Sequence, residues 1–182
     1  MILEIVQFGH PALRARGAQV HEITQEVRKL AADMIETMRD ADGVGLAAQQ
    51  VAVPIQLAVV DVTGVEDRPS AMWVGGQPVR VEDWMPMILI NPQLELGAEK
   101  EAGTEGCLSF PNMTAQITRA SRVRVKSRLL DGREVEFEAE GLLSRALQHE
   151  VDHLNGVLFV DRMSAAAKAA LAGKLKRLQR RG

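Results

Sequence analysis

The sequence lacks several features that mark whole classes of protein. It has a single cysteine, Cys107, so no disulfide can form within the chain, which favours a reducing environment. No apolar run approaches the roughly 18 residues of a membrane-spanning helix. No basic segment followed by an apolar run opens the chain, so we expect no signal or transit peptide. Together these absences predict a cytoplasmic protein without a membrane partner.

Aromatic residues and excess positive charge are also missing. Aromatics make up 3% of the 182 residues and tyrosine is absent, which argues against extended base-stacking surfaces for nucleic acid. The net charge is -2, from 22 basic and 24 acidic residues, whereas bulk nucleic-acid binders are usually strongly basic. We therefore expect no DNA partner.

The pattern of apolar residues predicts an α+β fold in one domain over residues 1–182. The chain is 46% hydrophobic, which suits an ordinary globular domain that buries a sizeable core. Apolar positions at helical spacing, with Thr24 and Ser164 as candidate caps, predict three helices. These helices are expected at 24–39, 141–154 and about 164–180.

Short apolar or alternating runs between the helices predict strands. Residues 56–61 and 87–90 are typical of buried strands, the second closed by Asn91-Pro92. Residues 122–126 and 134–139 alternate apolar with charged side chains around an Asp-Gly turn, which predicts a hairpin with one wet face and cross-strand ion pairs. Strands and helices do not alternate regularly, so we expect small mixed or antiparallel sheets.

The connection from Thr63 to Pro86 is unusually long and contains both tryptophans, Trp73 and Trp84. Structureless connections of this length are uncommon in compact domains. We therefore expect an insertion at about 63–86 that forms its own hairpin. It is either a surface excursion pinned by the tryptophans or a lid over a site.

The strongest chemical signal is His149-Glu150-Val151-Asp152-His153, an HExxH pattern in the second predicted helix. Residues four apart share a helix face, so His149 and His153 can hold one metal ion. Glu150 lies to one side of them, where it can reach a metal-bound water without being a ligand. Taken alone, the pattern also arises by chance on surface helices.

A catalytic metal needs a third protein ligand and an open position for water. Cys107, within Glu105-Gly106-Cys107-Leu108-Ser109, is the natural candidate. A lone cysteine is more often a small buried hydrophobe, but an HExxH pattern elsewhere in the chain reverses that preference. One thiolate with two imidazoles suits Zn or Fe(II).

A third motif, Gly43-Val44-Gly45-Leu46-Ala47-Ala48-Gln49-Gln50, follows the first predicted helix. Its glycines let the backbone bend and let another chain approach closely. It is not a dinucleotide fingerprint, because it lacks the third glycine and follows a helix instead of a strand. Alone it is best interpreted as a structural turn, although the Gln50 amide beside a metal could donate a hydrogen bond to an oxyanion.

Together the three motifs resemble those of the peptide deformylase family, GxGxAAxQ, EGCLS and HExDH, complete and in that order. The resemblance extends from 10–14 to 158–162. It implies a metal-dependent hydrolase that removes the N-formyl group from the initiator methionine of nascent polypeptides and releases formate. In that chemistry a metal-bound water, activated by Glu150, attacks the formyl carbon.

The resemblance also implies a ligand set. Cys107, His149 and His153 match the family's metal ligands. Members work with Fe(II), and Zn or Ni can replace it. We further expect three side chains to orient these ligands from behind the metal: Glu105 paired with Arg119, and Asp152.

Other site residues carry over from the motifs in the same way. Glu150 matches the general base of the family. The Gln50 side chain and the backbone N–H of Leu108 match its oxyanion stabilisers. Val44 and Gly45 match a segment that lines the methionine pocket and binds the substrate backbone.

The predicted C-terminal helix is basic. It holds six cations between Lys168 and Arg181 and no acid, and Leu171, Leu175 and Leu178 form an apolar stripe. One interpretation is a docked helix whose late cations complement its dipole. The family resemblance implies another, contact with ribosomal RNA by the tail, as in bacterial relatives.

Two other functions stay open. A zincin-like metallopeptidase shares the HExxH pattern, although Cys107 within EGCLS argues against it. A non-catalytic, ribosome-associated relative would keep the fold but has no need of a base such as Glu150. A formyl-peptide assay run beside a casein assay separates these possibilities.

Overall fold

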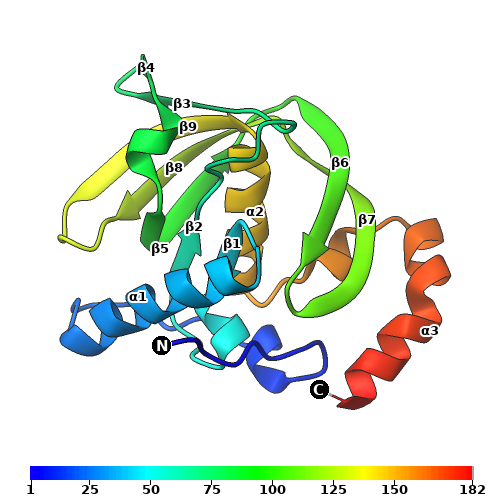
Figure 1. Cartoon of the computed structure of the whole chain (residues 1–182). Coiled ribbons are helices and arrows are strands. Elements are labelled where there is room, and N and C mark those ends of the chain that lie inside the picture. The colour runs from blue at the N-terminus through cyan, green and yellow to red at the C-terminus, as the bar shows by residue number, and fades with distance from the viewer. Residues whose placement is uncertain (182) are drawn as a thin grey trace.

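The computed structural model describes residues 1–181 and confirms the α+β prediction. A large sheet and a two-stranded ribbon lie on either side of a central helix, α2 (Figure 1). Helix α1 lies against the lower part of the large sheet, and α3 packs outside the ribbon (Figure 1). In the described part of the chain, no helix has the length and apolar character needed to cross a membrane.

The three helices lie where the sequence predicts them: α1 Gln25–Asp40, α2 Leu142–Leu154 and α3 Ala165–Arg181. The Thr24 hydroxyl accepts a hydrogen bond from the Val27 N–H at 3.3 Å and caps α1. The Ser164 hydroxyl accepts one from Ala167 at 3.1 Å at the start of α3. Four short 3₁₀ turns, η1 to η4, span Pro11–Arg14, Ala48–Val51, Val81–Trp84 and Phe159–Arg162.

The large sheet has seven strands, and every neighbouring pair is antiparallel. In spatial order they are β1 Gly45–Ala47, β2 Leu57–Val60, β5 Met87–Leu96, β8 Arg122–Arg128, β9 Glu134–Gly141, β3 Ser70–Val74 and β4 Gln77–Val79. The ribbon pairs β6 Lys100–Cys107 with β7 Phe110–Ala120. The predicted hairpin is β8–β9, and its charges do pair, for example Arg122 with Glu138 at 2.7 Å.

The predicted strand end at Asn91-Pro92 is wrong, because β5 continues to Leu96. The pairing of β5 with β8 shifts register between Ile90 and Gln93. Asn91 takes a positive φ of 52° there, a conformation that asparagine tolerates. Asn and Pro therefore mark a bulge inside the strand instead of its end.

Residues 63–86 contain the expected hairpin, formed by β3 and β4. Strand β3 also pairs with β9, so the hairpin extends the large sheet. The guanidinium carbon of Arg122 lies over the Trp73 ring, 4.1 Å from the ring centre. Trp84 packs against the hydrophobic core of the sheet. Within this segment only Arg68 lines the cavity described below.

Helix α2 is buried along most of its length between the sheet and the ribbon. Small side chains let it lie close to the sheet: Ala47 of β1 and Ala58 of β2 form a buried cluster with Leu154 at its C-terminal end. The histidine motif is therefore held in the interior, where the ribbon closes over it from the other side.

Candidate metal centre

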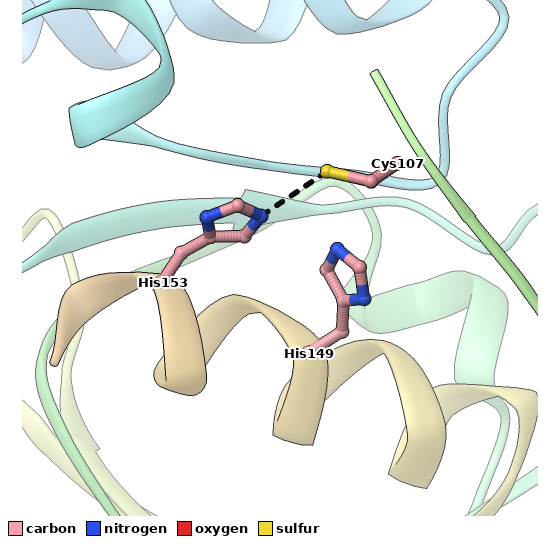
Figure 2. A group of neighbouring side chains, drawn as sticks. All are labelled: Cys107, His149 and His153. Carbon is pink, nitrogen blue, oxygen red and sulfur yellow. Dashed lines mark hydrogen bonds between the residues drawn. The ribbon is translucent and has the colours of Figure 1, made fainter. Parts of the chain in front are cut away.

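The three predicted ligands meet at one point between α2 and the ribbon. Figure 2 shows His149 and His153 rising from α2 toward Cys107, which ends β6. One ligand atom from each lies within 4.8 Å of the other two, and His153 Nε2 is 3.3 Å from Cys107 Sγ. A strand end and a helix separated by many residues thus supply one compact donor set.

The donor set suits a divalent metal. Nδ1 of His149 lies 2.9 Å from the Glu105 carboxylate, and because an ionised carboxylate only accepts, Nδ1 carries the proton and Nε2 stays free to bind a metal. A thiolate beside two imidazoles is a set that Zn and Fe(II) accept. In the described chain, Glu150 Oε1 is buried beside these ligands without a hydrogen-bond partner, as expected of a group whose partner is bound water.

Glu105 connects the ligands to a buried ion network. Its carboxylate accepts hydrogen bonds from Arg119 at 2.8 and 2.9 Å and from Arg145 at 2.7 Å. Burial alone would raise the pKa of Glu105, but Arg119 and His149 hold it well below its usual range. The charged carboxylate fixes the His149 ring, and the expected pairing of Glu105 with Arg119 is confirmed.

The network continues to Asp152, nearly one turn further along α2. Arg119 donates to Asp152 at 2.6 Å, as expected, and Arg162 of η4 donates to Asp152 at 2.9 Å. Sequence reasoning missed Arg145 and Arg162. Arg145 had a signal, since it lies four residues before His149 and shares its helix face. Arg162 had none, because only the fold brings η4 to α2.

We expect Glu105→Gln to weaken metal affinity by about 10–100-fold, because an amide holds the imidazole less firmly than a carboxylate does. It should also destabilise the fold by about 3–5 kcal/mol, since buried arginine charges lose their partner. Metal titration and denaturant unfolding measure the two effects. Glu101→Gln on the same strand is the control, because that side chain is exposed. Wild-type affinity in Glu105→Gln would contradict the positioning role.

Gln50 is held in one orientation beside the ligands. Its Oε1 accepts a hydrogen bond from the Ala47 N–H at 2.9 Å. Its Nε2 donates to Ser109 Oγ at 3.1 Å and lies 3.6 Å from Cys107 Sγ. The amide therefore presents its N–H groups, and not its oxygen, toward the metal centre. Sequence reasoning missed Ser109, whose role depends on a side-chain contact between distant segments.

Glu150 is buried on α2 beside the ligands. In the metal-free chain, burial raises the pKa of Glu150 to about 7. A carboxyl group with a pKa near the working pH is suited to taking and returning a proton.

One cavity of about 470 Å³ opens onto this centre. It is lined by all the predicted site residues except His153: Val44, Gly45, Gln50, Cys107, Leu108, His149 and Glu150. The motifs therefore converge on a single space. The side chains of Leu142 and Ala146 on α2 add apolar lining.

Comparisons with known proteins agree with this geometry. A family model described as polypeptide deformylase matches residues 2–169. The chain is 46% identical over 180 residues to a peptide deformylase of Methylacidiphilum infernorum, covering 99% of this chain and 94% of that one. It is 41% identical over 180 residues to one of Acinetobacter baumannii, covering 98% and 93%.

Solved structures are similar as well. The peptide deformylase from Thermus thermophilus matches with a TM-score of 0.83 and 34% identity, over 100% of both chains. The one from Thermotoga maritima matches with a TM-score of 0.75 and 41% identity, over 90% of this chain and 99% of that one.

Proposed function

Because the chain belongs to the peptide deformylase family, we propose that it removes the N-formyl group from the methionine of nascent polypeptides in one catalytic domain, with Glu150 as its general base. It is a metal-dependent hydrolase with a Cys/His/His metal site. The observation that carries the function is the convergence of the three ligand atoms within 4.8 Å beside the buried Glu150 carboxylate. Formate release from a formyl peptide, with casein as the comparison substrate, tests it against peptidase activity.

Fe(II) is the metal we propose for the site, with Zn or Ni as replacements. The donors Cys107, His149 and His153 support a borderline-soft divalent ion. When bound, such an ion makes water nucleophilic at neutral pH and polarises a carbonyl oxygen. The chain's own contribution is to hold the donor atoms close together. Glu105 orients His149 by a hydrogen bond, and His153 Nε2 lies close to Cys107 Sγ.

Glu150 is the proposed proton carrier of the reaction. It accepts a proton from the attacking water and returns it to the leaving amine. Its carboxylate lines the same cavity as Cys107 and His149, and its buried Oε1 has no competing partner within the described residues.

Gln50 and Leu108 stabilise the negative charge that develops on the formyl oxygen. Ala47 occupies Gln50 Oε1, and Ser109 Oγ accepts from Gln50 Nε2, so the amide is held with its nitrogen beside Cys107, at the reacting centre. The backbone N–H of Leu108 is the second donor, from the turn that follows Cys107, and Leu108 lines the cavity.

We expect Gln50→Ala to lower kcat/KM by the equivalent of about 3–4 kcal/mol, since one oxyanion donor is lost in the transition state. Steady-state formate release measures the change, and metal content should stay at the wild-type level. Gln116→Ala on the exposed face of β7 is the matched control. An unchanged kcat/KM in Gln50→Ala would remove Gln50 from this role.

Val44 and Gly45 form the proposed substrate-binding edge. Both line the cavity opposite the ribbon, and Leu142 and Ala146 give it an apolar wall suited to a methionine side chain. Formyl is the smallest acyl group, so a narrow space around the metal excludes larger ones by contact.

The C-terminal helix α3 is the proposed ribosome contact of a cytoplasmic enzyme. Its Leu175 and Leu178 are buried in a core cluster with Phe110 and Phe159. That packing leaves the late cations exposed, so the helix can dock and present positive charge at the same time.

Replacing exposed α3 cations with glutamine should abolish salt-sensitive co-sedimentation with ribosomes and leave formate release unchanged. The reason is that phosphate contacts need charge, whereas the leucine stripe keeps the helix docked. The variant set is Lys174, Lys176 and Arg177. The control set, which removes equal charge from exposed positions elsewhere, is Arg16, Arg28 and Arg80. Full co-sedimentation of the first set would refute ribosome binding by α3.

A further inference from the structure

Gly45 occupies a position where the backbone does not require glycine. It begins β1 and pairs with Val60 of β2 in regular antiparallel register. Its φ is not among the positive values found at seven other glycines. An alanine would therefore adopt this backbone without strain, so any need for glycine comes from the surrounding space.

That space is filled by Glu150. A Cβ atom added at Gly45 would overlap Glu150 Oε2 and would lie 2.8 Å from its Cδ and 3.0 Å from its Cγ. Carbon atoms in contact prefer about 3.5–4.0 Å. The end of the Glu150 side chain therefore lies directly over the Cα atom of Gly45, in the volume that any larger residue would take.

The register of helix against strand explains this placement. Glu150 and Leu154 are one turn apart on the same face of α2. Gly45 and Ala47 lie on the same face of β1 because they are two residues apart. Leu154 packs on Ala47, so one turn earlier Glu150 meets Gly45. The strand thus accommodates the helix with small residues at two successive contacts.

Packing is what holds the carboxylate there. Glu150 Oε1 is buried and no hydrogen bond from residues 1–181 reaches it. By contrast, His149 and Gln50 are each held by hydrogen bonds. A side chain without such a tether takes its position from the shape of the space around it.

We propose that Gly45 is a positioning residue for the general base. The missing side chain at 45 leaves the slot that holds the Glu150 carboxylate at the edge of the metal centre. This role is separate from binding the substrate backbone, and it rests on the proposed function of Glu150. An added methyl group would push the carboxylate out of the slot.

The test is Gly45→Ala in two backgrounds, Glu150 and Glu150→Ala. With Glu150, kcat should fall about 100-fold, since a displacement near 1 Å costs that much, while KM for formyl-Met-Ala-Ser stays within about twofold. With alanine at 150, which has no carboxylate for the added methyl to displace, the further loss in the residual kcat should be under about threefold. An equal loss in both backgrounds, or a raised KM with kcat kept, would overturn the proposal.

A second readout is independent of catalysis and of the metal. In metal-stripped protein that keeps Glu150, Gly45→Ala should lower the unfolding temperature by about 2–8 °C, because the slot is overfilled. In the Glu150→Ala background, Gly45→Ala should not lower the unfolding temperature. Equal losses in both would contradict the contact. If Glu150 were not the base, Glu150→Ala would keep wild-type kcat while this unfolding cycle still held, so the two failures are distinguishable.

Gly173→Ala is the control for adding a methyl group. Gly173 lies in α3, and its added Cβ would meet only Arg177 Nη1, at an ordinary 3.6 Å. We expect kcat and KM to stay at wild-type values in this variant.

Discussion

Glu150→Gln should lower kcat/KM for a formyl peptide by about 10²–10⁴-fold, the range that a positioned general base contributes. Glutamine matches the shape of glutamate and keeps the packing over Gly45, but it cannot accept the proton of the attacking water. The fold and the metal site should remain, because Glu150 holds neither His149 nor Cys107 by a hydrogen bond. Formate release and metal content, measured on the same preparation, give both quantities.

Glu134→Gln is the control for this substitution, since Glu134 is exposed on β9. It should leave kcat/KM unchanged. Activity of Glu150→Gln within about tenfold of wild type, less than any general base contributes, would show that another group carries the proton.

Cys107→Ser should empty the metal site and stop the reaction. A catalytic site needs three protein ligands, and a serine hydroxyl does not ionise to replace the thiolate. The metal content should fall from about one per chain to under about a tenth after dialysis. Formate release should fall to background, and His153→Ala should behave in the same way.

His21→Ala is the control for loss of a histidine, because His21 is exposed. Its metal content and activity should equal those of the wild type. A fully loaded, active Cys107→Ser enzyme would mean that the metal is held elsewhere.

Local features of the fold were predictable from the sequence. Thr24 and Ser164 cap helices as expected, because a capping hydroxyl acts on a backbone N–H three residues away. The hairpin β8–β9 was predictable from alternation around one turn. His149 and His153 were placed together by helix periodicity alone. The third ligand, Cys107, was predicted as the single cysteine of a chain that also carries an HExxH pattern, but how β6 meets α2 was not predictable, because no local rule brings the two together.

Features that depend on tertiary contacts escaped prediction. The bulge at Asn91 was mistaken for a strand end, because the same residues serve both and only pairing with β8 decides between them. Arg162 reaches Asp152 through the fold of η4. The slot over Gly45 depends on how α2 lies across β1, and the sequence pattern of neither element predicts that arrangement.

Formate release from formyl-Met-Ala-Ser, by protein purified without oxygen and loaded with Fe(II), tests the central claim most directly. Wild-type protein should release formate at many turnovers per bound metal, while Cys107→Ser, prepared in the same way, should release almost none. No formate from a folded, metal-loaded wild-type chain would contradict the deformylase function and leave a ribosome-associated binding role in its place.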